Sequence, residues 1–91
     1  MKKIRTMVNI SGLVQGVSFR YFTVGKAIEH NVTGWVRNLP NGDVQGCFEG
    51  KEDDVRALID WCRIGPGHAR VDNVSAQQKE YTGEFRDFQV R

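Results

Sequence analysis

The stretch DDVRALIDWCR, residues 53–63, carries the clearest helical pattern in the chain, and the other elements can be placed around it. Apolar side chains recur there at positions i, i+3, i+4 and i+7, namely Val55, Leu58, Ile59 and Cys62. This spacing puts them on one face of an α-helix. Acidic residues open the stretch, Arg63 closes it and Gly65-Pro66 follows, which is the order that helix ends favour. We therefore predict an amphipathic helix here.

Strand patterns flank this helix on both sides. Before it, TGWVRNL (33–39) and VQGCFEG (44–50) have the composition of strands, and the turn residues of NLPNGDV between them predict a β-hairpin. After it, ARVDNVSAQQKEY (69–81) predicts one strand and FRDFQV (85–90) predicts a short terminal one.

The N-terminal part of the chain adds one more strand and one more helix. In KIRTMVNI (3–10), the alternate positions of a half-buried strand hold Ile4, Val8 and Ile10. From Ser18 or Arg20 to His30 the pattern favours a helix, with Phe22, Ala27 and Ile28 as its apolar residues. Asn31 suits the left-handed residue that ends such a helix.

The resulting order is strand, helix, strand, strand, helix, strand, with a short final strand. This order is typical of the ferredoxin-like α+β sandwich (βαββαβ), in which two helices cover one face of an antiparallel sheet. The length of 91 residues suits a single domain over residues 1–91. Many unrelated activities use this arrangement, so function has to be argued from the site.

The composition is that of an ordinary globular protein, with 40% hydrophobic and 26% charged residues. A formal charge of +2 without blocks of like charge implies neither nucleic acid nor a membrane surface as a partner. The N-terminus lacks an apolar run of signal-peptide or spanning length, so we expect a cytoplasmic protein, and a monomer at this size. Cys47 and Cys62 are expected to be reduced, packed thiols, with one disulfide as the alternative.

The stretch GLVQGVSFR, residues 12–20, joins the first predicted strand to the first predicted helix. Glycines permit sharp turns, and successive N–H groups at a helix N-terminus bind anions. Arg20 adds a planar guanidinium that matches phosphate oxygens. The stretch has no GK[ST] ending and no GxGxxG, and Val14 stands where a C-x5-R phosphatase loop ending at Arg20 would need cysteine. These residues suggest a phosphate cradle; the alternative is a tight connection with Arg20 in solvent.

Two segments resemble the signature motifs of the acylphosphatase family. They are ISGLVQGVSFR (10–20) and GWVRNLPNGDV (34–44), and the second motif ends a few residues later with Gly50. The similarity extends to the residues around Gly65-Pro66 and to the ending at 85–90, so that it covers essentially the whole chain. One departure is His30, where members usually carry an apolar residue; it lies outside both motifs.

The resemblance implies hydrolysis of the carboxyl–phosphate bond of acyl phosphates to a carboxylate and inorganic phosphate, without a metal or an organic cofactor. It assigns phosphate binding to the guanidinium of Arg20 and to the backbone amides of Gln15, Gly16, Val17, Ser18 and Phe19. It assigns the holding of the attacking water to the side chain of Asn38. Inorganic phosphate or sulfate should compete with the substrate, whose acyl group the sequence does not identify.

The chemistry agrees with this set of residues. A carboxylate leaves without a proton donor because its conjugate acid has a pKa of about 4. Phosphoryl transfer then needs mainly positioning and charge stabilisation. An asparagine does not act as a base near neutral pH, but its carbonyl can orient a water. On local sequence alone, Asn38 is better explained as a turn residue; the paired motif favours the site.

The remaining candidates have simpler explanations. His30 and His68 lie outside the motifs, and the acidic residues at 52–54 suit a helix start better than a metal site. Five aromatic residues are interpreted as packing residues of the strands and the second helix: Trp35, Phe48, Trp61, Phe85 and Phe88. The basic and aromatic motif of RNA-binding sheets is absent from the sequence. The alternative function is a catalytically weak module that binds anions.

Overall fold

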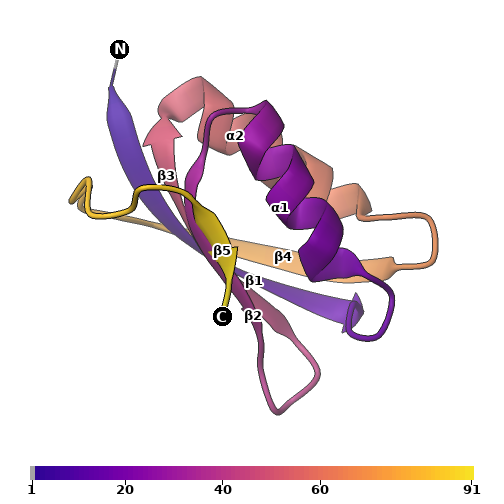
Figure 1. Cartoon of the computed structure of the whole chain (residues 1–91). Coiled ribbons are helices and arrows are strands. Elements are labelled where there is room, and N and C mark those ends of the chain that lie inside the picture. Colours follow the sequence, from indigo (N-terminus) through magenta and orange to yellow (C-terminus); the bar gives the residue numbers. More distant parts are fainter. Residues whose placement is uncertain (1) are drawn as a thin grey trace.

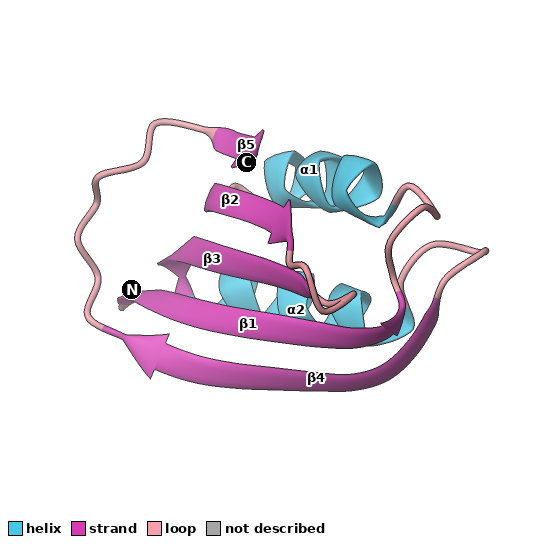
Figure 2. Cartoon of the chain, turned by 90° about the horizontal axis from the view of Figure 1, so that it is seen from below, coloured by secondary structure: helices cyan, strands magenta, loops and turns pink. Residues whose placement is uncertain are grey.

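The computed structural model describes residues 2–91, in which a five-stranded sheet carries two helices on one face (Figures 1 and 2). The predicted order of elements is confirmed. The elements are β1 (Lys3–Leu13), α1 (Phe19–Glu29), β2 (Thr33–Asn38), β3 (Val44–Lys51), α2 (Glu52–Ile64), β4 (Arg70–Lys79) and β5 (Phe88–Val90). Neither helix of this part of the chain has the length or the apolar run that a membrane span requires.

The strands lie in the order β4-β1-β3-β2-β5. The first four pair antiparallel, as predicted, whereas β5 pairs parallel to β2, with Val90 opposite Val36. The parallel pair arises because residues 80–87 carry the chain along the end of the sheet before β5 begins (Figure 2). A strand of three residues is too short for a sequence pattern to predict its partner.

The core lies between the sheet and the helices. Along β1 every second residue is buried: Ile4, Thr6, Val8 and Ile10. The four apolar residues predicted for α2 are its buried residues, and Gly65 ends the helix with φ 73°. Asn31 has the left-handed φ of 59° predicted for it.

The buried face of α1 differs from the prediction. Phe22 and Ile28 are exposed, and the buried residues of the helix are Phe19, Thr23 and Ala27. A threonine fits this face because its hydroxyl donates a hydrogen bond to the carbonyl of Phe19 (2.8 Å), so that the polar group is satisfied inside the core. The ring of Phe19 then packs against Trp61 of α2, with centroids 5.5 Å apart.

The predicted packing aromatics fall into two groups. Phe48 and Phe88 belong to the core and contact each other, and Trp61 packs against it. Trp35 and Phe85 lie outside the core and are half-buried. Their ring faces are covered by arginines: Arg37 and Arg91 lie over Trp35, and Arg5 and Arg91 over Phe85. Planar guanidinium groups stack well on aromatic rings, which allows these rings to remain outside the core.

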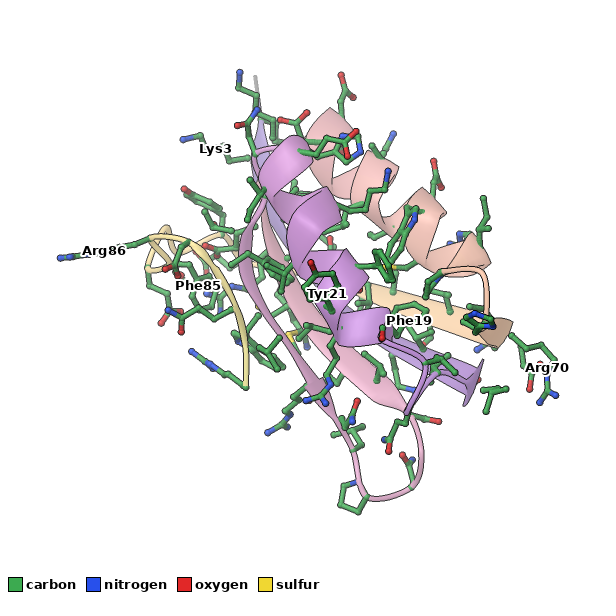
Figure 3. All side chains as sticks on the ribbon, turned by 45° about the vertical axis from the view of Figure 1, so that its right-hand side comes forward. Lys3, Phe19, Tyr21, Arg70, Phe85 and Arg86 are labelled. Atoms are coloured by element: carbon green, nitrogen blue, oxygen red, sulfur yellow. The ribbon has the colours of Figure 1, made fainter. Side chains whose placement is uncertain are left out.

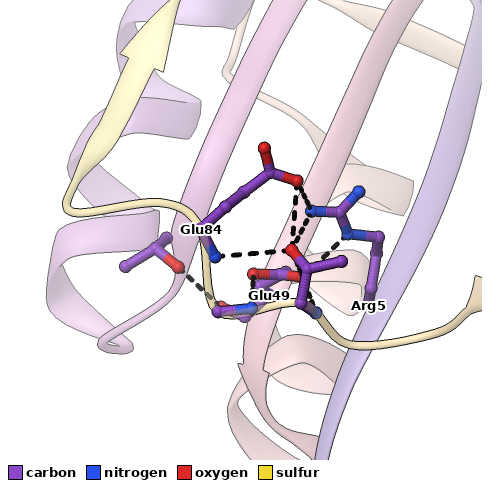
Figure 4. A network of polar contacts seen from close by, with 6 residues as sticks. Arg5, Glu49 and Glu84 are labelled. Carbon is purple, nitrogen blue, oxygen red and sulfur yellow. Dashed lines mark hydrogen bonds and ion pairs between the residues drawn. The ribbon is translucent and has the colours of Figure 1, made fainter.

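A buried carboxylate fixes the segment between β4 and β5 (Figure 4). Glu49 of β3 is fully buried and accepts hydrogen bonds from Arg5 Nε (2.7 Å) and from the backbone N–H groups of Thr82 (2.9 Å) and Gly83 (3.2 Å). Arg5 also pairs with Glu84, which raises the pKa of Arg5 and lowers that of Glu84. This network ties residues 82–84 to β1 and β3, and so sets the path by which the chain reaches β5.

Candidate functional site

The loop after β1 and the end of β2 meet at one edge of the sheet. Both strands flank β3 and run antiparallel to it, so their carboxyl ends point the same way. β5 runs parallel to β2 and adds its residues at the same edge. Between these parts lies a cavity of about 790 Å³. Phe19 and Tyr21 mark the start of α1 beside it (Figure 3).

The cavity brings together most of the residues proposed for the site. Its walls include Gln15, Gly16, Ser18, Phe19, Arg20 and Asn38. The exception is Val17, which lines a separate hollow against Trp61 and Pro66. The role proposed for Val17 belongs to its backbone amide. The position of its side chain does not test that role.

The loop 14–18 is bent by two residues with positive φ. Gly16 has φ 76°, a conformation that costs glycine little. Ser18 has φ 63° and precedes α1 as its N-cap residue, but its side chain forms no capping hydrogen bond. A left-handed serine costs on the order of 1 kcal/mol or more, and such strain is found most often at ligand sites.

The N–H groups of this loop have no backbone acceptor. Among the backbone hydrogen bonds outside regular elements in residues 2–91, none has a donor from residues 15–19. The first turn of α1 contains no acidic residue. Arg20 forms neither a hydrogen bond nor an ion pair with any other described side chain, although it is half-buried in the cavity wall. Unpaired N–H groups at a helix N-terminus and a nearby guanidinium are the groups with which proteins bind anions.

Asn38 lines the same cavity, and its side chain carries a buried acceptor without a partner. Its side-chain oxygen Oδ1 is the buried side-chain polar atom without a hydrogen-bond partner among residues 2–91. An unsatisfied buried amide oxygen costs about 1–3 kcal/mol, so its presence calls for an explanation. An acceptor that the protein leaves unpaired in a cavity wall is suited to a water or ligand hydrogen.

The side chain of Gln15, which also lines the cavity, is bonded to the β2–β3 turn. Its amide nitrogen Nε2 donates hydrogen bonds to the carbonyl oxygens of Leu39 (2.7 Å) and Asp43 (2.9 Å), at the base of the β2–β3 turn. The sequence motif assigns a role only to the backbone amide of this residue. The apolar wall that Phe88 and Val90 provide was not predicted, because the pairing of β5 has no local signal in the sequence.

The other titratable candidates lie elsewhere. Neither His30 nor His68 lines the cavity. Within residues 2–91 no group of three or more histidine, cysteine or acidic side chains has the arrangement of a metal site. Cys47 and Cys62 are free, buried thiols, and burial raises the pKa of Cys62 to about 12. They occur on β3 and α2 respectively, away from the cavity walls.

Comparison with known proteins identifies close relatives. The acylphosphatase family matches residues 6–90. An acylphosphatase of Geotalea uraniireducens (strain Rf4) is 61% identical over 88 residues, which cover 97% of this chain and 97% of that protein. The crystal structure of acylphosphatase from Bacillus subtilis matches with a TM-score of 0.93 and 26% identity, covering 97% of this chain and 98% of that one. The structure of an acylphosphatase from Coxiella burnetii matches with a TM-score of 0.92 and 39% identity, covering 98% and 93%.

Proposed function

The chain belongs to the acylphosphatase family and is a hydrolase of acyl phosphates, and we propose that residues 15–20 bind the phosphoryl group while Asn38 holds the attacking water. One observation carries this assignment. The residues of the cavity wall include unpaired backbone N–H groups, an unpaired guanidinium and an amide oxygen without a partner, and a phosphate or a water would supply the partners that they lack.

The phosphate end of the substrate is a dianion. The amides of Gln15 to Phe19 lie at the positive end of the α1 dipole, and Arg20 supplies a fork of donors for two phosphate oxygens. Donors that are already in place when charge develops on the equatorial oxygens lower the barrier without reorganisation. Arg20 and these amides therefore bind both the ground state and the transition state.

The attacking water has to be oriented toward phosphorus, and it needs no general base to remove its proton. The carbonyl of Asn38 accepts a hydrogen bond from it and aims its oxygen at phosphorus, in line with the departing carboxylate. The new bond joins water oxygen to phosphorus, and the bond between phosphorus and the acyl oxygen breaks. The carboxylate leaves with the electron pair and no proton, and the proton of the water passes to a phosphate oxygen. The products are a carboxylate and inorganic phosphate.

Hydrolysis of benzoyl phosphate in the presence of EDTA tests this assignment. We expect turnover without metal, its near loss in Arg20→Ala and a decrease on the order of 10²-fold in Asn38→Ala. Inorganic phosphate should compete with the substrate, because both use the same donors. Phosphate binding without turnover in the unmodified protein would instead support the alternative, a module that only binds anions.

The proposed mechanism contains no protein group that gains or loses a proton. The rate should therefore vary little between about pH 5 and pH 8, where histidine titrates. A bell-shaped profile that disappears in a His30 or His68 variant would contradict the mechanism.

We further propose that the chain works as one domain, as a monomer, and in the cytoplasm. Both helices and all the described strands share one core, which supports the single domain. Light scattering coupled to size-exclusion chromatography tests the monomer, for which a mass near 10.3 kDa is expected.

A further inference from the structure

Gln15 connects the two halves of the proposed site through its side chain. Its Nε2 group has two hydrogens, and both are used, one on the carbonyl of Leu39 (2.7 Å) and one on that of Asp43 (2.9 Å). These carbonyls also accept the hydrogen bonds that close the β2–β3 turn, from the N–H of Gly42 (3.1 Å) and of Leu39 (2.8 Å) respectively. Each oxygen has two lone pairs, so the turn and Gln15 are satisfied together.

The hydrogen bonds of Gln15 lie between the two groups of residues proposed for the site. On the hairpin, Leu39 follows Asn38 directly in the chain. On the loop, Gln15 directly precedes the amides of residues 16–19 and lies five residues before Arg20. Two hydrogen bonds therefore join the backbone next to the water-holding residue to the start of the phosphate-binding loop.

A second contact holds the same turn from the sheet. Asn9 of β1 donates from Nδ2 to the carboxylate of Asp43 (2.7 Å), and Asn41 accepts from the N–H of Asp43 (3.0 Å). The turn therefore has its own attachment to β1 without Gln15. Loss of the Gln15 contact should leave the hairpin folded but release the loop from it.

We propose that Gln15 is a positioning residue, whose side chain sets the placement of the phosphate-binding loop relative to Asn38. This inference rests on the proposed function. The loop amides and Arg20 are consecutive residues and keep their mutual arrangement when the contact is lost, so phosphate affinity should be largely retained. What changes is the alignment between the bound phosphoryl group and the water, and a misplacement of about 1 Å lowers a rate on the order of 10²-fold.

The test is a double-mutant cycle with Gln15→Met and Asn38→Ala. Methionine has nearly the shape of glutamine but cannot donate a hydrogen bond. We expect Gln15→Met to lower kcat for benzoyl phosphate by about tenfold or more, while the inhibition constant for inorganic phosphate stays within about threefold. In the Asn38→Ala background the same change should alter kcat by less than about twofold, because no oriented water is left to misalign.

Two further variants keep the test decisive. Gln15→Ala leaves room for water to satisfy the carbonyls of Leu39 and Asp43, and it replaces Gln15→Met if that variant is unstable. Gln78→Met, at an exposed position of β4, is the matched control and should behave as the unmodified protein.

The possible results separate this inference from the proposed function. Equal decreases in kcat in both backgrounds, or a loss of phosphate affinity that parallels the loss of kcat, would show that Gln15 does not position the loop against Asn38. If Arg20→Ala keeps full turnover, or phosphate does not inhibit the unmodified protein, the proposed function itself fails, and the inference fails with it.

Discussion

The arginines Arg5 and Arg20 have opposite surroundings in the same small fold. Arg5 bonds with Glu49, Thr82 and Glu84 and stacks on Phe85, so its guanidinium has protein partners on several sides. Arg20 has neither a hydrogen-bond nor an ion-pair partner among residues 2–91, and it lines the cavity beside unpaired N–H groups. A charge whose partners belong to the protein contributes to stability, whereas one without partners is available to a ligand.

The helix N-termini differ in the same way. α2 begins with three acidic residues, Glu52, Asp53 and Asp54, whose charges complement its dipole. α1 has no acidic residue in its first turn, and neither helix has a side-chain cap. The chain therefore neutralises the positive helix end that has no proposed role and leaves open the one at the site.

The largest expected effect follows from removing the unpaired arginine. Arg20→Ala should lower kcat for an acyl phosphate by about 10³-fold or more, because the proposed mechanism then loses a charged donor to the transition state. The free energy of unfolding should change by less than about 0.5 kcal/mol, since Arg20 has no protein partner to lose. Both quantities can be measured on one preparation, by hydrolysis of benzoyl phosphate and by urea denaturation.

Arg86→Ala is the matched control, because Arg86 is exposed and points away from the sheet (Figure 3). It should leave both quantities unchanged. A large loss of stability in Arg20→Ala would mean that this arginine has a structural role. Arg20 and Arg5 would then not differ in the way proposed.

The next effect concerns the paired arginine. Glu49→Gln places an amide among the N–H donors of Thr82 and Gly83 and removes the buried counter-charge of Arg5. Breaking a buried ion pair on one side should lower the free energy of unfolding by about 3 kcal/mol. Urea denaturation measures the loss, and the folded variant should keep most of its kcat at low temperature.

Glu52→Gln is the control for this change. Glu52 pairs with Arg56 on the surface of α2, and the variant should lose less than about 1 kcal/mol. Similar losses in the two variants would show that burial of Glu49 adds nothing to its pair with Arg5.

A smaller effect depends on pH. Arg5, and then the Thr82 hydroxyl, hold the pKa of Glu84 below its ordinary value. A carboxyl with a lowered pKa in the folded state stabilises the fold above its unfolded pKa of about 4, and this contribution disappears as the pH falls through the folded pKa. Glu84→Gln should therefore be less stable than the unmodified protein at pH 7, and the difference should vanish in acid. A difference that does not change between pH 7 and pH 2 would have another cause.

Local patterns in the sequence predict some of these features and leave out others. The buried face of α2 was predicted correctly because four apolar residues repeat over two helical turns between clear end signals. The face of α1 was not, since it includes Thr23, whose burial depends on a hydrogen bond to Phe19 that a hydropathy pattern does not contain. Local periodicity reports burial only where the buried residues are apolar.

The same limit applies to the candidate site. The motifs led to Arg20 and Asn38, and the structure places both at one cavity, although their roles stay predictions. The Gln15 side-chain contacts and the burial of Glu49 join residues 24 to 44 positions apart, and neither has a sequence pattern of its own. Contacts of this kind depend on the completed fold, so they had to come from the structure.

The smallest expected effect concerns Cys47, because the pKa of its thiol depends on the charges of Arg5 and its partners. Burial raises the pKa of this thiol, the charge of Arg5 lowers it, and the carboxylates of Glu49 and Glu84 raise it. In the unmodified protein Cys47 should therefore react slowly with a disulfide reagent at pH 8. Glu84→Gln removes one compensating charge, so the thiol pKa should fall and the reaction should accelerate, by less than about tenfold.

Cys62 serves as the internal control for that measurement, because it lies in α2 and the charge that affects its pKa besides burial is that of Arg63. Global unfolding exposes both thiols together, whereas a change in the charges near Arg5 acts on Cys47 alone. Faster reaction of Cys47 with an unchanged rate at Cys62 would therefore show that the charges around Cys47 are no longer balanced when the Glu84 carboxylate is removed. Equal acceleration at both thiols would mean that Glu84 acts only by keeping the protein folded. The positive charge of Arg5 would then be compensated by Glu49.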